Sequence, residues 1–276
     1  MTFLSNFVKH LIPLLFLMSL TPLRASFEDL CPSAKGRGLA EATSATLRDP
    51  SQLFGNPAAI FCSQLKGAFT FARPFGLKEL DYGQMSLALP YKSITVGAGA
   101  KSFGNALYRE TLFAVALSHQ PFAALHVGAG LSYGMVKIQN YNSTGTFLVD
   151  IGANAQLFHN LNFGFSIRNL NHSKIGNARE PLPSTLQTGL LVNLDAVNLC
   201  VDLSKEIRYP LDFRCGLEIK VLYPLIIRSG VATQPSRFSA GFGLCFKQFR
   251  LDYGFSTHSV LNVSHQFSID IHILQF

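Results

Sequence analysis

The amino-acid sequence predicts an all-β fold, a transmembrane antiparallel β-barrel of about 14 strands with an N-terminal hatch, or plug, inside its lumen. Three observations lead to this prediction. From Gln64 onward, apolar and polar residues alternate with the period of two that is typical of strands. The chain is 48% hydrophobic and only 14% charged, yet no stretch after Leu20 approaches the ~20 apolar residues of a membrane helix. The stretch Asp49–Ile60, with two prolines and a glycine, fits no strand.

The start of the chain has the features of a secretory signal peptide. Lys9 and His10 supply basic character, the apolar run Leu11–Leu20 follows, and Ala25 ends a short cleavage site. An N-terminal anchor helix is the alternative, but the apolar run is short for a bilayer. We therefore expect a signal peptide at residues 1–25, an N-terminal hatch segment at residues 26–63 and a transmembrane β-barrel at residues 64–276.

The strand-like stretches come as successive antiparallel pairs. The predicted strands are Leu65–Pro74, Leu80–Leu89, Lys92–Phe103, Leu107–His119, Phe122–Ile138, Thr144–Phe158, Asn160–Leu170, Ser184–Leu194, Ala196–Lys205, Asp212–Leu222, Leu225–Ala232, Arg237–Phe246, Gln248–Phe255 and Val263–Leu274. Tight connections such as Pro90-Tyr91 alternate with longer loops such as Asn171–Pro183. Short periplasmic turns and longer extracellular loops are typical of outer-membrane barrels. We therefore expect a location in the outer membrane of a Gram-negative type of cell, surrounded by outer-membrane lipid.

The two faces of the predicted strands differ in character. In Arg237–Phe246 the even positions are all apolar, whereas the odd positions include Gly241 and Gly243. A secreted β-sandwich would show the same alternation with inside and outside exchanged. The membrane barrel is favoured because the apolar face carries few polar residues and the polar face is rich in small residues, as a filled lumen requires.

Strand parity also assigns a set of charged residues to the lumen. These lumen charges are Arg109, Asp150, Arg168, Asp202, Arg214, Glu218, Arg228, Arg237, Arg250 and Asp252. We expect them to form ion pairs that grip the hatch, because buried charges need partners. A specific anion-binding site is the alternative.

The composition also excludes several classes of function. The net charge of +7 does not indicate nucleic acid, because the basic residues are spread singly along the strands. Motifs of serine hydrolases, zinc proteases and phosphate-binding loops are missing, so we expect no enzyme activity, no metal and no cofactor. Of the five cysteines, Cys31 and Cys62 either form a disulfide in an oxidising periplasm or are small buried residues.

The N-terminal segment has its own pattern. Gly36–Leu47 is rich in alanine and small residues and predicts about two turns of helix. Pro50 and Pro57 then prevent a longer helix or a central strand. Asn56 before Pro57 fits a plain turn leading into the first strand, which is the simplest interpretation of this pair.

Several short stretches resemble one family. They are Gly36–Ala42, Asp49–Ser51, Phe54–Ala58, Leu182–Gly189, Leu251–Phe255 and Ser264–Ser268. This pattern resembles the PorV/PorQ proteins, which belong with the FadL-like outer-membrane barrels. The resemblance implies a hatch inside the lumen whose motif comprises Asp49, Pro50, Asn56, Pro57 and Ala58. The chain departs from the family in having Arg48 where a second Asp is common and Ala59 where Gly often follows.

Two functions follow from the resemblance. The first is that of a PorV/PorQ-type accessory or cargo-handling component of type IX protein secretion, with a translocon and cargo proteins as partners. The alternative is a FadL-like transporter that passes a hydrophobic small molecule through a hatch-gated lumen.

Overall fold

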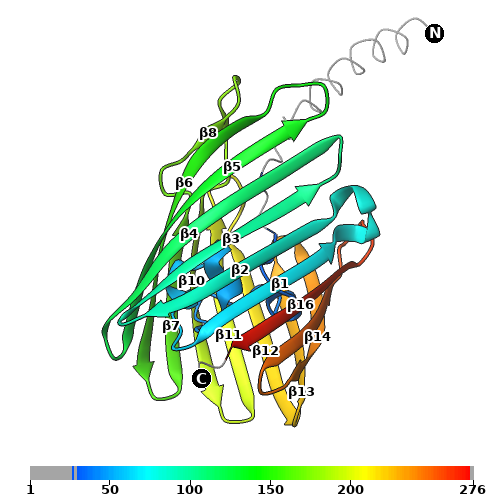
Figure 1. The fold of residues 1–276 in the computed structure, drawn as a ribbon. Coiled ribbons are helices and arrows are strands. Elements are labelled where there is room, and N and C mark those ends of the chain that lie inside the picture. Colours follow the sequence, from blue (N-terminus) through cyan, green and yellow to red (C-terminus); the bar gives the residue numbers. More distant parts are fainter. Residues whose placement is uncertain (1–26, 28–29, 274–276) are drawn as a thin grey trace, which may run out of the picture.

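The computed structural model of this protein describes residues 27 and 30–273. In these residues the chain forms a closed antiparallel β-barrel of fourteen strands, ordered around the barrel as they are in the sequence (Figure 1). The predicted all-β barrel of this strand number is confirmed, and the closed sheet excludes the β-sandwich. The predicted signal peptide, residues 1–25, lies outside the described residues.

The observed strands agree closely with the predicted ones. The barrel strands are β1 (Leu65–Arg73), β2 (Tyr82–Tyr91), β3 (Ile94–Gly104), β4 (Tyr108–Phe122), β5 (Leu125–Ile138), β6 (Thr144–Phe158), β7 (Leu161–Arg168), β10 (Thr185–Leu194), β11 (Val197–Glu206), β12 (Asp212–Leu222), β13 (Leu225–Thr233), β14 (Ser236–Cys245), β15 (Phe249–Ser256) and β16 (Ser264–Ile273). The sequence did not predict the small hairpin of β8 (Lys174–Ile175) and β9 (Glu180–Pro181), nor the short 3₁₀ turns η3 (Pro74–Gly76) and η4 (Lys78–Leu80).

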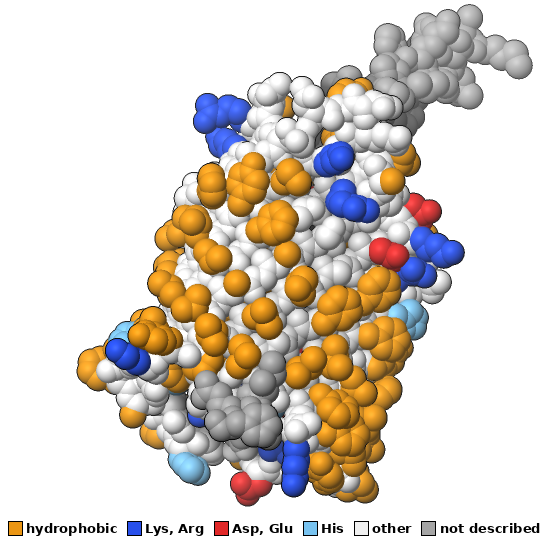
Figure 2. Space-filling view, viewed as in Figure 1, with side chains coloured by type: hydrophobic (Ala, Val, Ile, Leu, Met, Phe, Trp, Pro, Cys, Tyr) orange, Lys and Arg blue, Asp and Glu red, His pale blue; other side chains and the backbone are white. Residues whose placement is uncertain are grey.

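The barrel closes where its first and last strands meet. Leu65 of β1 is opposite Ile273 of β16, and Arg73 is opposite His265. Hydrophobic side chains point outward over much of the wall (Figure 2). On β4 the outward residues Phe113 and Val115 are 52% and 54% exposed, while the alternate positions along the strand are buried. This exposure is what lipid contact requires of a strand.

The described part of the N-terminal segment lies inside the barrel (Figure 1). It contains a helix, α2 (Ala34–Gly38), and two 3₁₀ helices, η1 (Pro50–Phe54) and η2 (Pro57–Ile60). Helix α2 packs against β13–β16, η1 against β1–β4 and η2 against β4–β6. The segment is therefore in contact with strands around much of the wall.

The predicted two-turn helix over Gly36–Leu47 is wrong in its extent. Helix α2 ends at Gly38, and Ala40 and Glu41 take φ angles of 52° and 69°. A right-handed helix cannot continue through residues with positive φ, and the glycines at 36 and 38 have low helix propensity. No helix among the described residues is long and apolar enough to cross a membrane.

Candidate functional site

Glycines in the wall let the N-terminal segment lie directly against the strands. A Cβ added to Gly128 would lie 2.4 Å from the backbone nitrogen of Ala58. One added to Gly164 would lie 2.0 Å from the carbonyl oxygen of Ser44. Both distances are shorter than any real Cβ contact, so a side chain at either position would displace the segment from the wall.

Asn56 links the segment to the wall and to itself. Its Oδ1 accepts a hydrogen bond from the N–H of Ala58 at 3.0 Å, which caps η2, and Pro57 occupies the first helical position. Its Nδ2 donates to the carbonyl of Ser44 at 3.0 Å and to Oδ1 of Asn154 on β6 at 2.8 Å. The Asn-Pro pair therefore begins a buried 3₁₀ helix rather than leading directly into β1.

Asp49 and Pro50 repeat the same arrangement one helix earlier. Oδ1 of Asp49 accepts from the N–H of Ser51 at 2.9 Å, and Pro50 begins η1. The N–H of Asp49 donates to the carbonyl of Ala59 at 3.1 Å and so joins the two 3₁₀ helices. The predicted motif residues are thus buried inside the barrel, where Asp49 and Asn56 cap the two 3₁₀ helices, Pro50 and Pro57 begin them, and Ala58 donates its N–H to one cap.

We expect the substitution Asn56→Ala to loosen the segment without unfolding the barrel. It removes a helix cap and a buried donor, which together stabilise the segment by about 2–3 kcal/mol. Hydrogen–deuterium exchange over residues 50–60 should become roughly 30- to 100-fold faster, at tenfold per 1.4 kcal/mol. Asn142→Ala in the exposed loop between β5 and β6 is the matched control. Equal exchange rates over residues 50–60 in both variants would show that Asn56 does not stabilise the segment.

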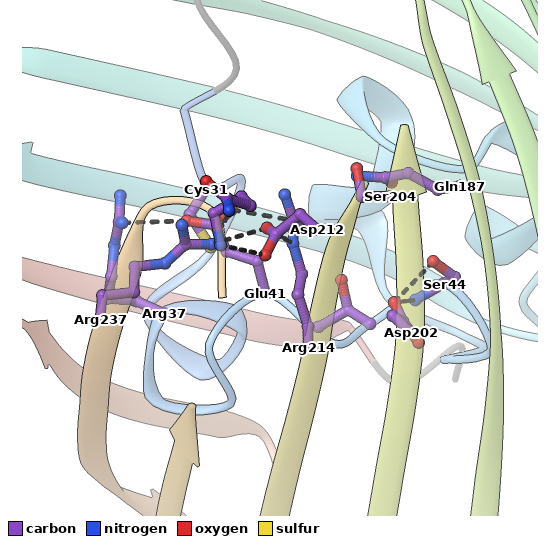
Figure 3. A network of polar contacts seen from close by, with 12 residues as sticks. Cys31, Arg37, Glu41, Ser44, Gln187, Asp202, Ser204, Asp212, Arg214 and Arg237 are labelled. Carbon is purple, nitrogen blue, oxygen red and sulfur yellow. Dashed lines mark hydrogen bonds and ion pairs between the residues drawn. The ribbon is translucent and has the colours of Figure 1, made fainter. Parts of the chain in front are cut away.

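The carboxylate of Glu41 joins the segment to two strands (Figure 3). It lies 3.1 Å from Arg237 of β14, 3.4 Å from Arg214 of β12 and 3.0 Å from Arg37 of the segment itself. Asp212 pairs with Arg214 at 2.7 Å. In these ion pairs, three guanidinium groups of the described residues share two carboxylates.

A second set of ion pairs joins strands β12, β13, β15 and β16 on the inner face of the barrel, next to α2. The guanidinium of Arg228 on β13 lies 2.6 Å from Glu218 on β12 and 2.6 Å from Asp252 on β15. Arg250 pairs with Asp252 at 2.7 Å and also with Asp270 on β16. Because the side chain of Arg228 is 0% exposed, each of these charges depends on its neighbours for compensation.

Three more of the predicted lumen charges also lie inside the barrel. Oδ2 of Asp202 accepts from the N–H and the hydroxyl of Ser44 at 2.8 and 2.6 Å (Figure 3). Asp150 accepts from the N–H of Asn169 at 2.8 Å, and it lines a cavity of about 50 Å³ together with Arg168. Asp202 thus holds the middle of the N-terminal segment.

The predicted lumen position of Arg109 is wrong. Arg109 is exposed and points outward, whereas its neighbour Glu110 is 5% exposed and accepts a hydrogen bond from the N–H of Phe27 at 2.9 Å. Both faces of β4 are apolar between residues 112 and 117, so the sequence of this strand does not reveal which parity faces the lumen. Glu110 is thus a lumen charge that the predicted set lacks, as are Asp212 and Asp270, which pair with the lumen arginines Arg214 and Arg250.

The longer connections, such as the one from β7 to β10, lie at one end of the barrel, which we call the long-loop end, and the tight turns, such as the one from β12 to β13, lie at the other, the short-turn end. A cavity of about 920 Å³, which we call the vestibule, lies at the long-loop end. Part of its lining is apolar, from Leu30, Phe75 and Phe103. Its charged part includes Arg37 and Glu41 with their partners on β12 and β14, and the carboxylates of Glu110, Glu180 and Glu206. The sequence does not predict the vestibule, because its lining comes from loops and strand ends that are far apart in the chain.

The neighbouring interior cavities are much smaller. One of about 20 Å³ shares Glu41 and Arg214 with the vestibule lining. The cavity of about 50 Å³ shares Phe54 and Arg168 with that smaller one. Spaces of this size hold waters, whereas the vestibule is in the range of small-molecule sites, about 300–1,000 Å³. The described N-terminal segment therefore narrows the interior sharply beyond the vestibule.

The described residues contain no cluster of His, Cys, Asp and Glu that could hold a metal ion. Cys31 and Cys62 are both buried thiols and do not form the disulfide considered from the sequence. The thiol of Cys31 donates to the carbonyl of Ser33, and that of Cys62 to the carbonyl of Ala88. Burial raises the pKa of the Cys62 thiol, which keeps it protonated.

Comparison with known proteins identifies the fold. No protein-family model and no curated protein matches the sequence. Among solved structures, the CymD monoaromatic hydrocarbon channel matches with a TM-score of 0.67 at 11% identity, over 88% of this chain and 98% of that chain. The P. putida toluene transporter TodX matches with a TM-score of 0.65 at 12% identity, over 88% and 99%. A Pseudomonas aeruginosa FadL homologue matches with a TM-score of 0.63 at 13% identity, over 89% and 99%.

The chain therefore has the FadL-like fold of outer-membrane barrels. The predicted location in a Gram-negative outer membrane is consistent with this fold and stays a prediction. The FadL-like part of the predicted resemblance is confirmed at the level of the fold, while the PorV/PorQ assignment stays a prediction. By their descriptions CymD is a channel and TodX is a transporter.

Proposed function

We propose that this protein is an outer-membrane transporter for hydrophobic small molecules, and that residues 26–63 act as a hatch within its barrel. In this proposal residues 1–25 are a signal peptide and residues 64–276 form the transmembrane barrel. The observation that carries the proposal is the vestibule, because it is a cavity of small-molecule size lined in part by the proposed hatch.

The vestibule is suited to capture an apolar molecule from the outside. Apolar side chains such as Leu30, Phe75 and Phe103 provide contact area, and burial of apolar surface drives such binding at about 25 cal/mol per Å². The matched structures include proteins described as a monoaromatic hydrocarbon channel and a toluene transporter. Their descriptions support the same substrate class for this chain.

Passage beyond the vestibule requires the N-terminal segment to move. The adjoining cavities of about 20 and 50 Å³ are too small for an aromatic hydrocarbon. The segment is held by polar contacts, such as those of Glu41, Ser44 and Asn56, and also by an apolar cluster. In this cluster Leu53, Phe54 and Ile60 pack with wall residues such as Leu112 and Val136. A movement that opens the lumen must therefore break both sets of contacts.

Liposomes that contain the purified protein should take up radiolabelled toluene faster than empty liposomes. Deletion of Ser26–Cys62 from the mature chain should remove the hatch and admit polar solutes such as a labelled disaccharide, because a barrel without its filling has an aqueous lumen. Circular dichroism and heat-dependent gel mobility would establish that the shortened barrel is folded. Toluene uptake equal to that of empty liposomes would exclude the transport function.

The second candidate is a PorV/PorQ-type role in type IX protein secretion. It rests on the N-terminal sequence pattern around Asp49-Pro50 and Asn56-Pro57, and these residues have a sufficient explanation as helix caps inside the barrel. This role predicts co-purification with a large translocon or with cargo carrying C-terminal signal domains. A protein isolated by gentle detergent extraction without such partners would argue against it.

A further inference from the structure

The outward residues of β4–β6 form rows that cross the strands. Phe113, Tyr133 and Phe147 are directly opposite one another on the three strands, and the rings of Tyr133 and Phe147 lie 5.0 Å apart between centroids. On the short-turn side of this row the outward residues are aliphatic, as in the pair Val115–Leu131. The aromatic row therefore borders an aliphatic field, as expected at a membrane interface.

Two cations lie beyond this aromatic row, toward the long-loop end. Arg109 of β4 is directly opposite Lys137 of β5, and both are exposed. Like charges directly opposite on adjacent strands are destabilising. The ion pairs of the described residues leave both cations out, and the loop at 139–143 contains no carboxylate. Among the described residues, the two positive charges thus lie together and no carboxylate pairs with either of them.

Their height relative to the lipid-facing wall locates them at the outer boundary of the membrane. From Arg109 to Leu117 the strand rises about 27 Å at 3.4 Å per residue. At the ~40° tilt typical of such barrels this is about 21 Å of height, close to the ~25 Å of the apolar band. Figure 2 shows Lys and Arg side chains toward the long-loop end, above the field of hydrophobic side chains.

We propose that Arg109 and Lys137 together bind a phosphate group of an anionic outer-leaflet lipid, such as the phosphorylated headgroup of lipopolysaccharide. Arginine suits bidentate recognition of phosphate oxygens, and lysine adds a second positive charge. Phe113, Tyr133 and Phe147 would then contact the acyl chains of the same lipid. The proposal rests on the outer-membrane location but not on transport through the lumen.

The position explains why a lipid, rather than a free anion, is the expected occupant. A free phosphate at an exposed pair of cations competes with water and salt, which screen such charges over about 8–10 Å. A lipid headgroup is held at the membrane boundary by its chains, so its phosphate is present at this height at high local concentration.

The test is binding of purified lipid A to the full-length mature protein in a neutral detergent, measured by native mass spectrometry. The variant R109Q/K137Q should bind phosphorylated lipid A at least tenfold more weakly than the wild type, because it loses two charged donors. The matched control is K92Q/K220Q, which removes two exposed cations at the short-turn end. The control should bind lipid A as the wild type does, and R109K/K137R should retain binding.

Stability provides a second measurement that is independent of transport. In neutral detergent R109Q/K137Q should unfold at the same or a higher temperature than the wild type, because it removes a like-charge pair. Added lipid A should raise the melting temperature of the wild type and of K92Q/K220Q, but not that of R109Q/K137Q.

Three results would overturn the proposal. Equal binding of dephosphorylated lipid A would show that the phosphate is not recognised. Equally weak binding of lipid A to K92Q/K220Q would show that the loss of binding results from the lower net charge alone. Displacement of lipid A by millimolar inorganic phosphate would assign the site to free anions. If R109Q/K137Q does not fold, binding of lipid A is measured on the single variants R109Q and K137Q instead. Wild-type affinity in both single variants would also refute the site.

Discussion

Replacement of Arg228 by leucine should lower the free energy of unfolding by about 3–5 kcal/mol, which is typical when one partner is removed from a buried ion pair. The guanidinium lies 2.6 Å from both Glu218 and Asp252, and the side chain is 0% exposed. Leucine would fill much of the space but leave two buried carboxylates with less compensation. Glu218 would keep its bond from Asn198 at 2.8 Å, and Asp252 its pair with Arg250 at 2.7 Å, which limits the loss.

The loss of stability is measured by unfolding the barrel in liposomes with guanidinium chloride as the denaturant. Arg179→Leu, at an exposed position near β9, is the matched control and should change stability by less than about 0.5 kcal/mol. A triple variant with Glu218→Gln, Arg228→Leu and Asp252→Asn should recover part of the loss, because it removes the uncompensated charges. Unchanged stability in Arg228→Leu alone would mean that water compensates these carboxylates in the lumen.

The barrel is predictable from the sequence because lipid outside and a polar lumen impose opposite demands on alternate residues. Asp212–Leu222 is an example: the predicted strand and β12 have the same bounds, and its charged residues Arg214 and Glu218 face the lumen. The same logic fails on β4, where both faces are apolar over several residues and the parity of Arg109 is not determined. Alternation carries information only where the two faces differ.

The candidate site is predictable only in part, for a related reason. The caps formed by Asp49 and Asn56 follow from local sequence, since an Asx residue before proline favours the start of a helical turn. The vestibule requires the three-dimensional arrangement of loops such as those at Phe75 and Tyr209. The meeting of Glu41 with Arg237 depends on how a segment without regular structure folds inside the lumen, and no periodicity encodes that path.

Glu41 is the contact that most directly tests whether the N-terminal segment is a movable hatch. Its carboxylate is shared by Arg37, Arg214 and Arg237, two of which belong to the barrel wall. Glu41→Gln keeps the size of the side chain and removes its charge. Hydrogen bonds to charged groups contribute about 1.5–3 kcal/mol each, so anchoring of the segment should weaken by about 3 kcal/mol.

If the segment gates the lumen, weaker anchoring raises the population of the open state. A change of about 3 kcal/mol corresponds to roughly 100-fold in an equilibrium constant. In planar bilayers Glu41→Gln should therefore open far more often than the wild type, and toluene uptake into liposomes should rise. Glu79→Gln, in the exposed turn η4, is the matched control and should behave as the wild type does.

A double variant separates loss of the anchor from other effects of the substitution. If Glu41 acts through Arg237, then Arg237→Gln should also raise the open population, and Glu41→Gln combined with Arg237→Gln should raise it by less than the product of the single effects. Equal opening and uptake in the wild type and in Glu41→Gln would instead identify the segment as a fixed plug. A fixed plug would leave the vestibule as a binding site that does not lead into the lumen, and any hydrophobic molecule captured there would have to leave through the wall above the plug.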